Sequence, residues 1–254
     1  MGIIAGSRLR ASAIRPFIIE VDTSRAGSAS DAFEFKNALG DYDVVAKQGG
    51  SVVQTFNNLS DEETITFSGG SGVYVLEITP KATNGFNRIA FDNGGDKDKI
   101  IDIKQWGEVA WTTFLNAFWG CQNILVTATD VPNLSSATNM QNMFRDATLA
   151  NPNTSNWDVS SVTNMYAIFY RASSANPDTS NWDVSSVTNM QSMFRDSNIS
   201  VENLTACYEN WSQLNLQQNV EFSAGSTKYN SSGQAGRDIL VNTYNWIIED
   251  GSQV

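Results

Sequence analysis

The sequence has no histidine, which removes the side chain most often used for proton transfer near neutral pH and the commonest metal ligand. No Ser-His-Asp or Cys-His catalytic set can therefore form. A phosphate-binding G-x-x-x-x-G-K-[ST] loop is also missing, and no spacing singles out a catalytic pair of carboxylates. We predict that the protein is not an enzyme and binds no cofactor, with a glycan-degrading enzyme as the weaker alternative.

Long apolar runs are missing too, since no segment approaches the ~18 residues of a membrane span. The opening MGIIAGSRLRASAIRPF is interrupted by arginines too early for a secretory signal. We expect no signal peptide and no membrane insertion. The only two cysteines, Cys121 and Cys207, fall in opposite caps of the repeat array described below, too far apart for a disulfide. We expect two free, mostly buried thiols.

Positive charge is scarce: 16 Lys and Arg stand against 27 Asp and Glu, for a net charge of −11. Such a balance argues against a nucleic-acid partner, because phosphate backbones attract basic surfaces. The first 19 residues carry only the positive charges of Arg8, Arg10 and Arg15. Residues 1–16 are rich in Gly, Ala, Ser and Arg and cannot form a core by themselves. We interpret them as an arm that anchors the protein to an acidic or groove-like neighbour in a large assembly.

What the sequence does contain is a repeat. ANPNTSNWDVSSVTNM at residues 150–165 returns as ANPDTSNWDVSSVTNM at 175–190, with a period of 25 and one difference in sixteen positions. Diverged copies end at Phe118 and Phe144, which makes about four turns. The residues after each Ser-Ser have helical spacing, as in Val162, Met165 and Phe169, and the serine can cap a helix. We predict one short helix in each repeat.

A single 25-residue unit cannot bury Trp, Met and Phe alone, so we expect the units to stack. Stacking predicts two continuous ladders, formed by Trp106, Trp157 and Trp182, and by Phe118, Phe144, Phe169 and Phe194.

The motif SNWDVSSVTNMQSMF at residues 180–194 resembles the BspA-like leucine-rich-repeat surface proteins, with the mycoplasma-lipoprotein-type 25-residue repeats found in phage and marine bacterial surface proteins. The resemblance covers about residues 99–252, including a closing cap that begins at SVENLTACYENW. It implies adhesins and surface binders without an established catalytic centre.

Before the repeats, residues 17–98 contain short β-prone runs such as FIIEV, ETITF and GVYVLEI, separated by Gly, Asn and Asp turns. We predict a mixed α+β chain: the arm at 1–16, an antiparallel Ig-like or PKD-like β-sandwich at 17–98, a leucine-rich-repeat-like solenoid with one helix per repeat at 99–200, and a cap at 201–254.

Two groups of polar residues are candidates for binding. The position after each phenylalanine is variable and holds Arg or an aromatic residue, which binding surfaces favour; these residues are Trp119, Arg145, Tyr170 and Arg195. Asn153 and Asp178 recur in register, although their turns explain them as well. A calcium site at Asp92, Asn93, Asp96 and Asp98 lacks the required loop spacing, so we predict no metal.

Together these features favour a phage virion structural protein on the particle surface, as a capsid decoration, head-fibre or tail-fibre component. The arm, through Arg8, Arg10 and Arg15, would bind shell or tail proteins. The repeats would adhere to the host surface, where a glycan is the candidate ligand, and the chain would be a homo-oligomer in the assembly. A secreted bacterial adhesin or glycan-binding module is the alternative.

Overall fold

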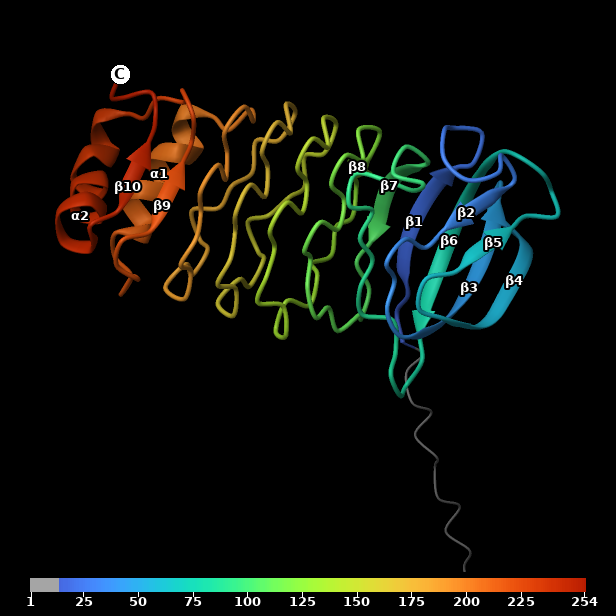
Figure 1. Cartoon of the computed structure of the whole chain (residues 1–254). Helices are drawn as coiled ribbons and strands as arrows, with labels where there is room; N and C mark the ends of the chain where they lie inside the picture. The colour runs from blue at the N-terminus through green and yellow to red at the C-terminus, as the bar shows by residue number, and fades with distance from the viewer. Residues whose placement is uncertain (1–13) are drawn as a thin grey trace, which may run out of the picture.

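The computed structural model describes residues 14–254 as an elongated molecule with β-strands at one end, a row of stacked turns in the middle and helices at the other end (Figure 1). Residues 1–13, with Arg8 and Arg10 of the predicted arm, lie outside the described part.

The strand end is built on one six-stranded sheet. Its order is β4-β3-β6-β1-β7-β8, antiparallel throughout except for the parallel pair β7 and β8. Every second side chain of the central strands is buried, as the alternation of apolar and polar residues requires. The strands are β1 (Phe17–Asp22), β3 (Asp41–Gln48), β4 (Ser51–Ser60), β6 (Val73–Pro80), β7 (Ile100–Gln105) and β8 (Leu125–Val126).

The predicted antiparallel sandwich is wrong. Its second sheet is only the three-residue pair β2 (Ala32–Glu34) and β5 (Thr64–Thr66), and the main sheet is mixed rather than antiparallel. The β-prone runs at residues 33–35 and 63–67 are too short to build an opposing sheet, and the run at residues 88–91 forms no strand. The edge of the main sheet is instead extended by β8, which comes from the segment predicted to hold repeats.

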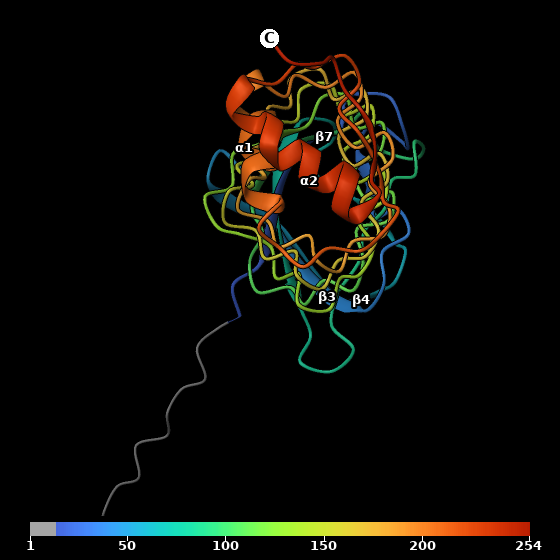
Figure 2. The ribbon, with the colours of Figure 1, turned by 90° about the vertical axis from the view of Figure 1, so that its left-hand side faces the viewer.

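The predicted leucine-rich-repeat-like solenoid with one helix per repeat is also wrong. Residues 14–254 are mostly β and turn, with two short α-helices, α1 (Val201–Trp211) and α2 (Gln234–Tyr244), both after the last repeat. They lie together at the end of the molecule (Figure 2). The parallel pair β9 (Glu221–Ser223) and β10 (Ile247–Glu249) lies at the same end (Figure 1), and both helices contact the 3-10 turn η1 (Ser231–Gly233). Among the described residues, no helix is long and apolar enough to span a membrane.

The repeats form turns because each contains a residue in the left-handed region, which ends any helix. The φ angle is 56° at Asn142, 53° at Ala167 and 56° at Ser192. Backbone N–H groups then bond to the next repeat instead of the preceding turn: Asn142 N–H donates to Tyr166 O at 2.9 Å, and Ala167 N–H to Gln191 O at 2.9 Å.

Two consecutive tight turns reproduce the spacing of a helix face. Met143 N–H donates to Met140 O at 3.2 Å, and Ala147 N–H donates to Phe144 O at 3.1 Å. The four residues are all buried, so apolar positions three and four apart share one side without helical backbone. The apolar pattern was therefore right about burial and wrong about backbone.

The predicted phenylalanine ladder is confirmed. Phe118, Phe144, Phe169 and Phe194 stack with centroid separations of 5.4, 5.8 and 6.1 Å and interplanar angles of 18° or less. The tryptophan ladder holds only in part: Trp157 and Trp182 stack at 6.2 Å, whereas Trp106 meets Trp157 edge-on at 5.8 Å. Core residues from Phe17 to Trp246 form one continuous cluster, so the sheet and the repeats share a core.

Candidate binding face

The residue after each ladder phenylalanine is turned outward at the same place in every repeat. The chain bends there because the following position is left-handed, with φ of 78° at Gly120, 56° at Asp146, 58° at Arg171 and 59° at Asp196. Adjacent copies are joined by the N–H of this position: Gly120 donates to Arg145 O at 2.8 Å and Arg171 donates to Arg195 O at 3.0 Å. Outward side chains therefore lie in rows, one residue per repeat.

Three of the predicted binding residues form a stacked row. The guanidinium of Arg145 lies 4.7 Å from the ring centroid of Trp119 and 5.1 Å from that of Tyr170. This cation–π arrangement uses the faces of the two rings that point toward Arg145. The aromatic residues thus hold the row together, and those faces are not free to stack on a ligand.

Arg195 continues the row in the next repeat with a different environment. Its side chain is 50% exposed, and its Nη1 atom is 4.0 Å from Glu249 of β10. An exposed ion pair of this length contributes little to stability. The guanidinium of Arg195 is therefore available to a partner.

A second row, which the sequence pattern did not single out, lies beside the first and consists of Asp146, Arg171 and Asp196. Asp146 accepts a hydrogen bond from Trp119 Nε1 at 3.1 Å and pairs with Arg171 Nη1 at 3.5 Å. The side chain of Arg171 is 59% exposed. The signal for this row was in the sequence, because the position also varies in charge from repeat to repeat, as Asp, Arg and Asp.

Between the second row and a third, formed by Gln122, Thr148 and Ser173, runs a shallow open groove of about 550 Å³. Thr148 Oγ1 donates to Gln122 O at 3.1 Å and Ser173 Oγ donates to Thr148 O at 3.5 Å. These hydroxyl oxygens keep their acceptor capacity toward the groove. We call the three rows together the varied face.

Asn153 and Asp178 belong to a different turn of the repeat and do not join the varied face. Asn153 Oδ1 accepts from Ser155 Oγ at 2.8 Å, and Asp178 Oδ1 accepts from Ser180 Oγ at 2.7 Å. Each side chain also accepts the backbone N–H of the same serine. The two residues stabilise their own turns, as the alternative reading of the sequence had it.

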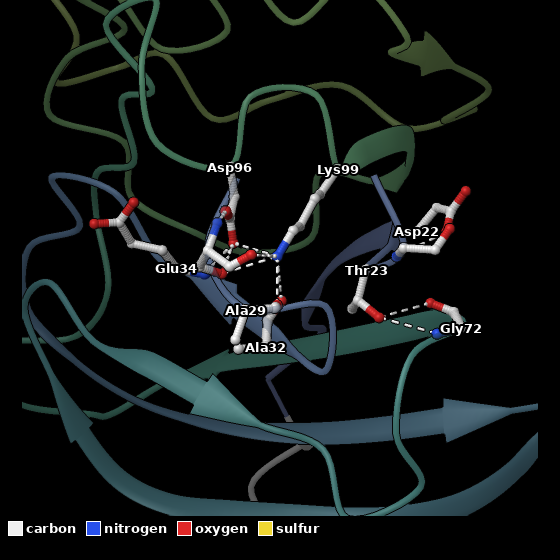
Figure 3. Close-up of polar contacts among 10 residues, drawn as sticks. Asp22, Thr23, Ala29, Ala32, Glu34, Gly72, Asp96 and Lys99 are labelled. Atoms are coloured by element: carbon white, nitrogen blue, oxygen red, sulfur yellow. Dashed lines mark hydrogen bonds and ion pairs between the residues drawn. The ribbon is translucent and has the colours of Figure 1, made fainter. Parts of the chain in front are cut away.

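The acidic segment considered for calcium pairs with lysines, and Figure 3 shows the pair of Asp96 with Lys99. Lys99 Nζ lies 3.5 Å from Asp96 Oδ2, with both side chains fully buried, and donates to Ser28 Oγ at 2.8 Å and to the carbonyls of Ala29 and Ala32 at 2.9 and 2.8 Å. Asp98 pairs with Lys97 at 3.0 Å. The ammonium group of Lys99 thus lies among these oxygen atoms, where a metal cation would otherwise have to lie.

Asp96 completes this cluster by accepting from Ser28 Oγ at 2.7 Å and from the N–H of Glu34 at 2.7 Å. In the part of the chain that the structure describes, no group of three or more acidic or cysteine side chains is placed to hold a metal ion.

The described end of the arm is held by the chain itself. Arg15 Nε lies 3.2 Å from Glu108 and Nη1 lies 3.9 Å from Asp130. Glu108 N–H donates to Arg15 O at 2.9 Å, and a Cβ atom at Gly107 would lie 2.2 Å from Pro16 O. Arg15 therefore packs against a turn that admits only glycine at position 107.

Both cysteines are free and buried, as predicted. Burial raises the pKa of the Cys207 thiol to about 12, and it raises the pKa of the Cys121 thiol well above its usual value. Neither group is a nucleophile near neutral pH, because the thiolate is the reactive form.

Taken with the fold, this geometry defines a protein of stacked 25-residue repeats that share one core with an N-terminal sheet and end in two helices. The chain belongs to the family described as Mycoplasma protein of unknown function, DUF285, which matches residues 96–234. The family is one of mycoplasma-type repeats. No curated protein and no solved structure matches the chain.

Proposed function

We propose that the chain is a structural protein on the surface of a bacteriophage particle, that its repeats are of the BspA-like type, and that it mediates anchoring and host-surface adhesion without catalysing a reaction. The particle position is a capsid decoration, head fibre or tail fibre. The observation that carries the adhesion role is the varied face, in which the stacked repeats hold exposed charged side chains and half-buried aromatic side chains in register.

Each repeat has one turn whose sequence is nearly constant and one face whose sequence varies, and this difference supports the adhesion role. The turn that begins with Asn151 or Asn176 is nearly identical in two copies, and its polar side chains bond within the turn or to the next copy. The varied face differs at every row from copy to copy. Repeat proteins recognise ligands through positions that their core and turns leave free.

The anchoring role is narrowed by the contacts of Arg15. Because Arg15 already pairs with Glu108 and Asp130 of its own chain, contact with a shell or tail protein is proposed for Arg8 and Arg10. Both lie outside the described residues.

Purified particles test the proposal. We expect mass spectrometry to find this chain among the proteins of washed particles. We expect electron microscopy to show density that matches the length of the molecule on the particle surface. Replacing both Arg8 and Arg10 by Ala should release it from the particles while the free protein stays folded. Particles that lack the chain altogether would contradict the proposal.

A secreted bacterial adhesin or glycan-binding module is the second candidate, favoured by a family whose description names a cellular organism. Recovery of the chain from the surface of uninfected cells would select it.

A further inference from the structure

We propose that the chain dimerises edge to edge, through antiparallel pairing of β4 with β4 of a second copy about a two-fold axis at Thr55. The interface lies at the strand end of the molecule and does not use the varied face. The inference does not depend on the proposed function, and it gives the homo-oligomer expected from the sequence a specific interface.

The outer edge of β4 is open. β4 is the last strand of the six-stranded sheet, at the edge far from the repeats (Figure 1). Its backbone pairs with β3, and among residues 14–254 no other backbone group bonds to it. Val52 and Val53 are 59% and 45% exposed although neighbours along a strand point to opposite faces, so neither face is covered here. The turn before the strand is also clear, since a Cβ atom at Gly49 or Gly50 would meet no atom within 4 Å.

β4 lacks the features that usually keep an edge strand from pairing. Its sequence, SVVQTFNNLS, contains no charged residue and no proline, and with ten residues it is the longest strand of the described chain. Charged side chains, proline and short length are common protections of edge strands. An open edge of this kind binds another strand through its unpaired backbone groups.

The edge is held in one position before any partner binds. Phe56 packs edge-on against Phe67 with the ring centroids 6.1 Å apart, and the side chain of Gln54 accepts the N–H of Ser68 at 2.9 Å. Both contacts come from one face of the strand and leave its edge free. A preformed strand loses less conformational entropy on pairing than a flexible one.

The pairing of β4 with β3 sets the centre of the interface. The register is regular from Gln54 to Phe56 and shifts on both sides of this stretch. Because bulges twist an edge away from a partner, the regular stretch is where a second strand fits, and its middle residue is Thr55. About a two-fold axis Thr55 meets its own copy, and threonine pairs are favourable across strands.

Charge favours a second copy in antiparallel orientation as the occupant. On a two-fold axis the strand meets itself, so a charged edge would face its own sign, and β4 has no charge to repel. Asp61, Glu62 and Glu63 follow the strand directly. Parallel pairing would bring two such acidic runs together, whereas antiparallel pairing places each run near the uncharged turn at Gly49 and Gly50 of the other copy.

The interface is small, which predicts weak association. One pair of edge strands buries less than the roughly 1,600 Å² of a standard stable interface, so we expect half of the chain to be dimeric at about 10–100 µM. Two chains of net charge −11 repel each other, and salt screens this repulsion. Added salt should therefore strengthen the dimer, whereas it would weaken an interface held by ion pairs.

The test is analytical ultracentrifugation of the full chain over a range of concentrations. We expect a species of twice the chain mass, and Thr55→Lys should weaken dimerisation by about tenfold or more, because two ammonium groups then face each other across the axis. Ser232→Lys is the matched control, since Ser232 is also exposed but lies in η1 beside the helices at the other end of the molecule. Urea unfolding shows that both variants stay folded, because both positions are exposed.

A cysteine at the same position reports the register. In Thr55→Cys, mild oxidation with diamide should link two chains by a disulfide, because residues directly opposite each other on antiparallel strands lie close enough. The native thiols are buried and should not react. Ser232→Cys is the control and should stay unlinked.

Three results would overturn the inference. They are a chain that stays monomeric at about 1 mM, a dimer that Thr55→Lys and Ser232→Lys weaken equally, and a dimer in which Thr55→Cys forms no link. None of them touches the proposed function, which is tested by the presence of the chain on particles.

Discussion

At the scale of single residues, the left-handed position inside the turns holds asparagine in two successive repeats, Asn116 and Asn142, and then Ala167 and Ser192. Asn142 Nδ2 donates to Asn116 Oδ1 at 2.9 Å, but Asn142 Oδ1 is buried without a partner, because the next repeat has Ala167 at this position. Ala167 is also held at φ 53°, which costs a residue with a Cβ atom free energy. The site combines an unsatisfied acceptor with a strained backbone.

Ala167→Asn should therefore stabilise the protein, since an asparagine tolerates the left-handed region and the new amide can donate to Asn142 Oδ1. We expect the free energy of unfolding in urea to rise by about 1–2 kcal/mol. Ala167→Gly separates the two causes, because it relieves the backbone and adds no donor. If Asn proves no better than Gly, the hydrogen bond is not formed.

Lys99 is a second residue whose role can be isolated. Lys99→Met leaves Asp96 buried without its cation, so we expect a loss of about 3–5 kcal/mol in the free energy of unfolding. Lys36→Met is the control: Lys36 pairs with Glu62 at 3.2 Å, the two side chains are 30% and 41% exposed, and its loss should cost less than about 1 kcal/mol. Equal losses in the two variants would contradict the role of the buried pair.

Burial of the Cys207 thiol makes stability depend on pH on the alkaline side. The pKa of Cys207 is raised from 9.0 to about 12 in the folded chain, so only the unfolded state ionises between these values. The stabilisation is complete below pH 9 and is lost as the pH rises toward 12. Urea unfolding across this range should show a falling free energy of unfolding, with a smaller slope in Cys207→Ala. An unchanged slope would assign the loss to other groups, such as Tyr42 and Tyr208, whose pKa values burial also raises.

At the scale of the element, each repeat is a turn that its neighbour completes. Part of its N–H groups, such as those of Asn142 and Ala167, bond to acceptors 24 residues away in the next copy, so no local signal in the sequence distinguishes the repeat from a helix. The buried tryptophans also depend on a neighbouring repeat for a hydrogen-bond acceptor. Trp182 Nε1 donates to Thr154 O in the preceding repeat at 2.9 Å, whereas Trp157 Nε1 has no partner. One period of 25 residues before Trp157, the tryptophan position of the repeat is occupied by Pro132.

This difference predicts unequal costs for the same substitution. Trp182→Phe loses a buried hydrogen bond to Thr154 O, which keeps only the backbone N–H of Trp157 at 3.1 Å, while Trp157→Phe removes a donor that has no partner. We expect Trp182→Phe to be the more destabilising by about 1 kcal/mol in urea unfolding. The reverse order would mean that packing, rather than hydrogen bonding, dominates the ladder.

At the scale of the whole molecule, the repeats form a line in which each copy contacts its neighbours, between a sheet at one end and the helices α1 and α2 at the other (Figure 1). Stability of such a chain is close to a sum of copies and interfaces. The two ends need not contact each other for either to fold.

Deletion of residues 151–175 tests this additivity. One period is removed in register, so Phe144 should meet Phe194, and the chain should unfold cooperatively with a smaller m-value because less surface is exposed on unfolding. Circular dichroism and urea titration measure both. Deletion of residues 151–163 is the control, since it brings mismatched positions together, and it should not fold; a folded control would argue against register as the determinant.

By itself the sequence determined the length of the repeat, the phenylalanine row and the alternating strands, because each depends on the period of apolar residues. Only the tertiary structure decided the backbone of the repeats, since spacing of three and four fits a helix and two consecutive turns equally. The choice rests on acceptors in the neighbouring copy. The cage around Lys99 and the second row of the varied face were likewise decided in space: Ser28, Ala29 and Ala32 lie 67 to 71 residues from Lys99, and Asp146 meets Arg171 only when two copies stack.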